Sequence, residues 1–194
     1  LLRASIHGNL KILVPMLSSV SELNQTLQFI KATKQSLDEE GIPYDNEVKI
    51  GGMIEIPAAA LALNIFARKL DFLSIGTGDL IPHTRAIDRT GEDVAHLYDP
   101  LHPAVLRLLS RVISTSNRLG VPISVCGEMA GESAYTRLLL GFGLRQFSMF
   151  SAQVPSIKQR VLTTSLPEIA GLTQKILRAD DPMKIRELLA RLNS

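Results

Sequence analysis

The 194-residue sequence predicts an α/β fold in which a parallel sheet is covered by helices. Two features of the pattern indicate this fold. Short runs that are apolar throughout recur along the chain, and a helical pattern separates each run from the next. Strands that are apolar on both faces are typical of buried parallel sheets, and helices are their usual connections. We expect five strands, over residues 11–16, 48–55, 71–75, 122–126 and 145–150.

The first elements are a strand and a long helix. Gly8 ends a short helical start, and the apolar run over 11–16 is bounded by turn residues, as a buried strand would be. Ser19 and Glu22 have the spacing of a capping box, in which each side chain bonds the other residue's backbone N–H. A helix therefore begins there and stops before Gly41, with an apolar stripe formed by Val20, Leu23, Leu27 and Ile30.

The middle of the chain continues the alternation. Pro57 is well placed to start a helix that runs from the second strand to about residue 70. After the third strand, residues 76–102 are interpreted as a longer polar connection. A helix over 103–119, closed by Gly120, then leads into the fourth strand.

The last part of the chain is mostly helical. A helix over 132–140 precedes the fifth strand, and no further strand is expected after it. Helical segments follow over residues 154–163, 166–178 and 182–193. No internal repeat or linker interrupts the pattern, so we interpret residues 1–194 as one domain or domain fragment.

Periodicity alone leaves two architectures open. A doubly wound open sheet and a (β/α) barrel both show this alternation, and five strands are too few to close an eight-stranded barrel. If the fold is a barrel, its first three strands are missing. The chain also begins Leu1-Leu2-Arg3, without a methionine and in what looks like the last turn of a helix. We therefore expect a piece of a longer protein.

Composition narrows the classes of partner and compartment. The 21 basic and 19 acidic residues are mixed along the chain, give a net charge of +2 and form no basic block, so nucleic acid is not an expected partner. Cys126 is the single cysteine, which excludes an intramolecular disulfide and leaves no CxxC zinc spacing. No apolar run approaches the ~20 residues of a membrane span, and no signal peptide opens the chain. A cytoplasmic protein without a membrane partner is expected.

Candidate functional residues lie where the predicted strands end, which is where parallel α/β folds place their sites. Glu55 closes the second strand, and a buried unpaired carboxylate there would be costly. Glu55 could bind a metal ion, or it could cap the helix that begins at Pro57. The sequence does not separate these two roles.

The third strand is followed by Gly76-Thr77-Gly78-Asp79. The glycines allow a ligand to approach the backbone closely, and Asp79 offers a hard oxygen to a cation. Glu55 and Asp79 could share one Mg²⁺, which usually takes one or two protein carboxylates and completes its shell with water and phosphate. An ordinary turn is the alternative. Further along, Arg89 could bind phosphate or carboxylate through its guanidinium, or form a surface ion pair with Asp88.

The fourth strand ends in a thiol, Cys126, and a glycine-rich turn follows it. A free cysteine is most often an inert core residue, but its place at a strand end favours a proton donor or nucleophile. The four histidines lack metal-ligand spacing and are interpreted as structural or surface residues. His102 is a candidate cap for the helix that begins at Pro103.

Six segments occur in a fixed order: GGMIEIPAAAL, DFLSIGTGDL, AIDR, HLYDPLHPAVL, ISVCGEMAG and LLLGFGLRQFSM. Over nearly the full length, this set resembles enzyme I of the bacterial phosphoenolpyruvate:sugar phosphotransferase system. The resemblance includes the nitrogen-branch enzymes and, more distantly, pyruvate phosphate dikinase and phosphoenolpyruvate synthase.

The resemblance implies the C-terminal five (β/α) units of a TIM (β/α)8 barrel that binds phosphoenolpyruvate. It implies that Glu55 and Asp79 hold Mg²⁺, that Arg89 binds phosphate, and that Cys126 exchanges a proton with the enolate of pyruvate. The remaining implied substrate contacts are Gly78, Asp79, Gly127, Glu128 and Met129.

The resemblance also implies partners. The phosphoacceptor histidine belongs to a separate upstream domain that this chain lacks, and that domain would meet a phosphocarrier protein. The barrel would form a homodimer. On its own, this fragment is expected to be inactive as a phosphotransferase.

Two departures from the family pattern leave other functions open. The family usually has Gly-Thr-Asn-Asp, whereas this chain has Gly78 in place of the asparagine. The following Thr-Gln-Tyr-Thr is replaced by Ile81-Pro82-His83-Thr84. A non-catalytic or regulatory homologue, or an enzyme of the dikinase and synthase type, therefore remains an alternative. A pyruvate-class lyase or aldolase would also need the two acids, but it has no evident use for the turn after Cys126.

Overall fold

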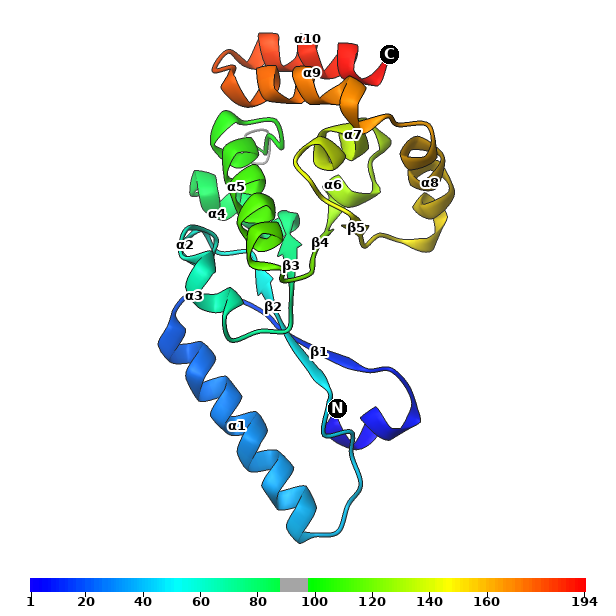
Figure 1. Cartoon of the computed structure of the whole chain (residues 1–194). Coiled ribbons are helices and arrows are strands. Elements are labelled where there is room, and N and C mark those ends of the chain that lie inside the picture. Colours follow the sequence, from blue (N-terminus) through cyan, green and yellow to red (C-terminus); the bar gives the residue numbers. More distant parts are fainter. Residues whose placement is uncertain (88–97) are drawn as a thin grey trace.

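A computed structural model describes residues 1–87 and 98–194, and that part of the chain contains one sheet of five parallel strands (Figure 1). Every predicted strand is present, with ends that differ from the prediction by a few residues. The largest difference is at the fifth strand, which is short and lies at the edge of the sheet. The strands are β1 (Lys11–Val14), β2 (Lys49–Ile54), β3 (Phe72–Gly76), β4 (Ile123–Cys126) and β5 (Gln146–Phe147).

Helices connect the strands and cover them. None of the helices in the described ranges is long and apolar enough to cross a membrane. They are η1 (Leu2–His7), α1 (Val20–Glu39), α2 (Pro57–Leu61), α3 (Leu63–Ala67), α4 (Thr77–Arg85), α5 (Pro103–Leu119), α6 (Glu128–Gly131), α7 (Ser133–Gly141), η3 (Ser151–Gln153), α8 (Val154–Leu162), α9 (Leu166–Arg178) and α10 (Pro182–Asn193).

Local capping signals are confirmed at both long central helices. Ser19 and Glu22 form the predicted capping box at the start of α1. At the start of α5, the His102 ring nitrogen Nδ1 accepts a hydrogen bond from the Ala104 N–H at 3.2 Å. Gly120 ends α5 with φ +71, a left-handed conformation that suits glycine. These helix boundaries are set by neighbouring residues.

The strand order decides between the two architectures. The strands lie side by side in chain order, β1-β2-β3-β4-β5, and every neighbouring pair is parallel. A doubly wound sheet reverses its order at a switch point, whereas each strand of a barrel lies beside its predecessor. Right-handed crossovers are the rule for parallel strands, and the connecting helices α1, α3 and α5 lie on the same side of the strands (Figure 1). The chain thus has the order of five consecutive units of a (β/α) barrel.

One prediction is wrong: residues 76–102 do not form a single polar connection. Helix α4 begins directly after β3, at Thr77, although its sequence contains Gly78 and an internal Pro82. Leu80 and Ile81 are 1% and 0% exposed, so burial of this apolar pair offsets the poor helix propensity. The rest of the predicted connection, including Asp88 and Arg89, extends into 88–97, outside the described residues.

The helix predicted to run from Pro57 to about residue 70 is also divided in two. It breaks at Ala62, where φ is −97° and ψ is 21°, and α3 continues beyond it. The second segment ends at Ala67. The apolar residues Leu63 and Phe66 of α3 are almost fully buried, and α3 packs against α5. The prediction of a helical region holds, and the prediction of one continuous helix does not.

The two faces of the sheet differ in chemistry. Because side chains alternate along a strand, the paired residues Ile54, Ile75, Val125 and Phe147 share one face, and the first three of them are completely buried. The opposite face carries one row of paired residues across four strands: Met53, Ser74, Ser124 and Gln146. Two residues further along the strands, Gly76 pairs with Cys126 on the same face. The first face meets the helices, and the second is the inner face of the barrel segment.

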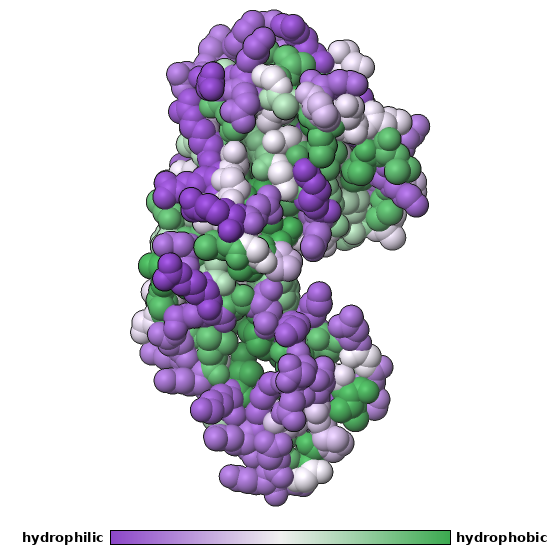
Figure 2. All heavy atoms as spheres, in the orientation of Figure 1, coloured by the Kyte–Doolittle hydropathy of each residue, from purple (hydrophilic) through white to green (hydrophobic). Residues whose placement is uncertain are grey.

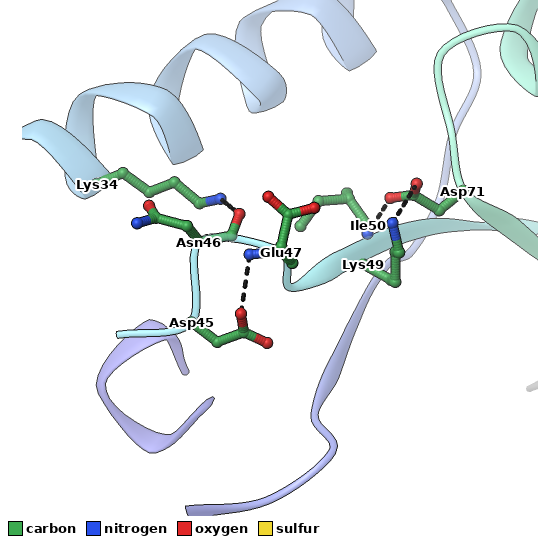
Figure 3. A network of polar contacts seen from close by, with 7 residues as sticks. All are labelled: Lys34, Asp45, Asn46, Glu47, Lys49, Ile50 and Asp71. Atoms are coloured by element: carbon green, nitrogen blue, oxygen red, sulfur yellow. Dashed lines mark hydrogen bonds and ion pairs between the residues drawn. The ribbon is translucent and has the colours of Figure 1, made fainter. Parts of the chain in front are cut away.

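A polar network lies at the amino ends of the strands, where β2 and β3 begin (Figure 3). Asp71, just before β3, accepts a hydrogen bond from the Ile50 N–H at 2.8 Å and lies 3.6 Å from Lys49 Nζ. Lys34 of α1 donates to the carbonyl of Asn46 at 2.8 Å. These contacts hold α1 and the first residues of β2 and β3 together. They lie at the opposite ends of the strands from the predicted site.

Candidate functional site

The carboxyl ends of β2, β3 and β4 bring the predicted residues to one edge of the sheet. Glu55 follows β2, the segment Thr77-Gly78-Asp79 follows β3, and Cys126 ends β4 beside Gly76. Because all three strands are parallel and adjacent, the residues that follow them share the same rim. Arg89 lies outside the described residues.

Glu55 is held at this rim by the backbone. Its side chain is 3% exposed, and Oε1 accepts a hydrogen bond from the Met16 N–H at 2.7 Å. The carbonyl of Glu55 lies 3.0 Å from Nδ1 of His83, so the ring donates to it and ties α4 to the end of β2. Helix α2 has no side-chain capping bond, and its N-cap is Ile56. The alternative that Glu55 caps this helix is therefore not supported.

The surroundings of the Glu55 carboxylate suit a cation. Within the described ranges, no lysine, arginine or histidine forms an ion pair with it, and its recorded donor is a backbone N–H. A buried carboxylate without a positive partner is costly, and a bound cation would offset that cost. Gly76 leaves room beside it, because a Cβ there would lie 2.9 Å from Glu55 Oε2.

The donor set suits magnesium better than a metal that needs a full protein cage. Asp79 lies in the first turn of α4, at the end of the strand next to that of Glu55. In the part of the chain that the structure describes, no group of three or more His, Cys, Asp or Glu residues could hold a metal ion. Magnesium needs only one or two protein carboxylates, because water and substrate phosphate complete its shell.

Thr77 is a site residue that the sequence analysis missed. It is completely buried, and its hydroxyl donates to the carbonyl of Cys126 at 2.9 Å. This bond joins the end of β3 to the end of β4. Gly127 lies against it: φ is +90, and a Cβ there would be 2.6 Å from Thr77 Oγ1 and 3.1 Å from Gly78 N. The glycines that follow both strands were the signal that two backbone segments approach each other here.

Cys126 is half-buried at this junction, unlike an inert core cysteine. Its Sγ accepts a hydrogen bond from the Ser74 hydroxyl at 3.5 Å, and the thiol donates to the carbonyl of Ile75 at 3.4 Å. The thiol also borders a cavity of about 420 Å³. The cavity is lined by Cys126, Gly127, Glu128, Glu132, Ser148, Met149, Phe150 and Gln153.

The remaining predicted contacts differ in their exposure. Gly127 and Glu128 are exposed at the cavity, so both can be reached by a ligand. Met129 is 1% exposed, with its side chain in the core, so only its backbone is suited to a substrate contact. Gly78 lies in the first turn of α4. Glu132, Ser148 and Gln153 line the same cavity and were not predicted. Glu132 precedes α7, and Ser148 and Gln153 reach the cavity only because the segment from β5 to η3 lies beside the end of β4.

Comparison with protein families matches residues 1–166 to the PEP-utilising enzyme, PEP-binding domain. The chain is 54% identical over 192 residues to a phosphoenolpyruvate-protein phosphotransferase of Cupriavidus necator, covering 99% of this chain and 33% of that protein. A protein of the same name from Enterococcus faecalis is 43% identical, over 90% of this chain and 31% of its own length. Another from Haemophilus influenzae is 40% identical, over 97% of this chain and 33% of its own length. The chain thus spans about a third of the length of these relatives.

Among solved structures, a citrate lyase from Burkholderia xenovorans is similar in fold. Its TM-score is 0.56 and its sequence identity is 22%, and the match covers 94% of this chain and 62% of that one. At this identity the similarity concerns the fold alone. It agrees with the α/β fold described above.

Proposed function

Because the chain belongs to the PEP-utilising enzymes, as their PEP-binding domain, we propose that it binds phosphoenolpyruvate and Mg²⁺ at the carboxyl edge of its sheet. We propose further that it does so as part of a longer phosphoenolpyruvate-protein phosphotransferase. The observation that carries the proposal is the buried carboxylate of Glu55, which has a backbone donor and no ion pair among the described residues. It lies on the same rim as Asp79 and Cys126.

In this proposal each residue has a separate task. Glu55 and Asp79 would hold Mg²⁺, which would neutralise charge on substrate oxygens when bound. Arg89 would grip the phosphoryl group through its guanidinium. The backbone of Gly78 and of the Gly127-Glu128-Met129 turn would approach the substrate. Cys126 would act as the acid and base at carbon.

The proposed reaction separates phosphoryl transfer from protonation. A histidine nitrogen, supplied by another domain, attacks phosphorus, and the bond from phosphorus to the enolate oxygen breaks. The electron pair stays on the enolate, whose carbon then takes the proton of Cys126 to form pyruvate. The thiolate that remains regains a proton from water. The phosphohistidine would pass its group to a phosphocarrier protein, in a homodimeric protein located in the cytoplasm.

A non-catalytic sensor is the second candidate, and Gly78 favours it. Glycine has no side chain to donate to substrate phosphate where the family pattern has asparagine. His83, the other departure, donates to the carbonyl of Glu55 and so supports the rim. A sensor that still binds phosphoenolpyruvate would show metal-dependent binding without label exchange between pyruvate and phosphoenolpyruvate, and a scaffold would show neither.

Calorimetry on the full-length protein with phosphoenolpyruvate, with and without Mg²⁺, tests the proposal. The substitution Glu55→Gln keeps an oxygen for the Met16 N–H but removes the charge. We expect it to weaken metal-dependent binding by at least the roughly 10–100-fold that loss of an outer-shell partner costs. The exposed Glu47 serves as the control, and Glu47→Gln is expected to bind normally. Equal binding by Glu55→Gln and the natural protein would contradict the proposed site.

A further inference from the structure

Two serine hydroxyls lie in line with the thiol on the inner face of the sheet. Ser74 of β3 and Ser124 of β4 are direct neighbours in the strand register. The Ser124 hydroxyl donates to Ser74 Oγ at 3.0 Å, and the Ser74 hydroxyl donates to Cys126 Sγ at 3.5 Å. Ser74 is 5% exposed, so water competes little for its hydroxyl. The chain of hydroxyls therefore ends at sulfur.

The hydrogen bonds of Cys126 differ between its thiol and its thiolate form. In the thiol, sulfur accepts from Ser74 and its own proton is directed to the carbonyl of Ile75. Once the proton has left, the carbonyl has nothing to accept, while the Ser74 donation becomes a charge-assisted bond to an anion. Such bonds are roughly twice as strong as neutral ones. Ser124 polarises Ser74 in the same direction.

We infer that Ser74 is a positioning residue for the proton transfer at Cys126, and that Ser124 supports it. Ser74 holds Sγ of Cys126, which lines the cavity, and stabilises the thiolate left when the enolate carbon takes the proton. The inference rests on the proposed function, in which Cys126 is the proton donor. The alternative is that the buried Ser74 hydroxyl and the partly buried Ser124 hydroxyl merely satisfy each other across neighbouring strands.

The test is exchange of carbon label between pyruvate and phosphoenolpyruvate in the full-length protein. Ser74→Ala is expected to lower kcat about tenfold, as loss of one hydrogen bond to a charged group does, with KM changed less than about twofold. The solvent deuterium isotope effect on kcat should rise, because proton transfer becomes slower. Ser124→Ala should act in the same direction but less strongly, and Ser74→Thr, which keeps the hydroxyl, should recover part of the rate.

Ser116→Ala is the matched control. Ser116 is completely buried in α5 and donates to the carbonyl of Val121 at 2.6 Å, far from the rim in the helix layer. Its loss should lower stability without changing kcat or the isotope effect. If Ser74→Ala folds poorly, Ser124→Ala still decides the question. A normal kcat in both Ser74→Ala and Ser124→Ala would overturn the inference.

Alkylation by iodoacetamide separates this inference from the proposed function. The rate at the peptide that carries Cys126 depends on its thiolate and not on phosphoryl transfer. Slower alkylation and slower exchange in Ser74→Ala support the inference. Slower alkylation with normal exchange would overturn it while leaving the proposed function intact. Normal exchange in Cys126→Ala would overturn both, because the thiol would then have no part in the reaction.

Discussion

At Gly127 the backbone and its neighbours leave space for no side chain. The combination of φ +90 and ψ −171 lies in a region that is essentially reserved for glycine. A Cβ would also lie 2.6 Å from Thr77 Oγ1, whose hydroxyl joins the ends of β3 and β4. Gly127 thus sets how closely the turn after Cys126 approaches the start of α4.

We expect Gly127→Ala to lower the free energy of unfolding by about 1–3 kcal/mol from backbone strain, with a further loss from the overlap with Thr77. Phosphoenolpyruvate binding should weaken with it, because the rim must shift. Gly120→Ala is the matched control: φ is +71, and nothing lies within 4 Å of the added Cβ. It should cost only about 1 kcal/mol. Urea unfolding and calorimetry measure both, and equal losses in the two variants would contradict the proposed overlap.

At the scale of the elements, the first turn of α1 is stabilised by a charged side chain, the carboxylate of Glu22. The pKa of Glu22 lies below its usual value, first because the Ser18 hydroxyl donates to it and next because the Ser19 N–H does. Both donors bond Oε2, at 2.6 Å and 3.1 Å. The same carboxylate closes the capping box and lies near the positive end of the helix dipole. The start of α1 therefore depends on an ionised Glu22.

The pH dependence of α1 follows from the sign of this shift. A carboxylate whose pKa is lower in the folded state stabilises the protein above its unfolded pKa, and that contribution is lost as pH falls through the folded value. The stability difference between the natural chain and Glu22→Gln should be constant near neutral pH and shrink on acidification. Ser18→Ala removes the hydroxyl that contributes most to lowering the pKa of Glu22. It should therefore reduce the pH-dependent part of this stability difference. Urea unfolding of the dispersed 194-residue chain measures this, and a difference independent of pH would contradict it.

At the scale of the molecule, the sheet ends at two edges, β1 and β5. Near the first edge, a groove of about 310 Å³ is lined mainly by apolar residues of η1, β1 and α1, among them Phe29, which is 73% exposed. Leu1 is 80% exposed in the same groove, and Phe150 is 83% exposed at the other end of the sheet. Apolar atoms reach the surface between polar ones in Figure 2. Open strand edges and apolar patches of this kind favour association.

We therefore expect the 194-residue chain, expressed alone, to be oligomeric or poorly soluble. Phe29→Ser should reduce this association, because it removes the most exposed aromatic group of the groove. Thr33→Ser, in the same groove, is the control that leaves the apolar surface nearly unchanged. Light scattering over a concentration series measures both variants. A monodisperse monomer of the unaltered chain would show that these edges do not associate.

Much of the fold could be read from short stretches of sequence, because the interactions responsible are local. Ser19 and Glu22 bond each other within one turn, His102 caps the helix that follows it, and Gly120 ends that helix through its own φ. Local signals also misled the prediction at α4. Gly78 and Pro82 both disfavour a helix, so the sequence predicted a loop there. The burial of Leu80 and Ile81 that outweighs them comes from distant residues.

The sequence by itself determined the alternation of strand and helix and the kinds of residue that follow each strand. Only the tertiary structure decided that the strands lie in chain order, and that Thr77 bonds Cys126 while Ser124 and Ser74 line up with its thiol. The physical reason is that periodicity and caps act between residues a few positions apart. Strand register joins residues about fifty positions apart in the chain, so it exists only once the sheet has formed.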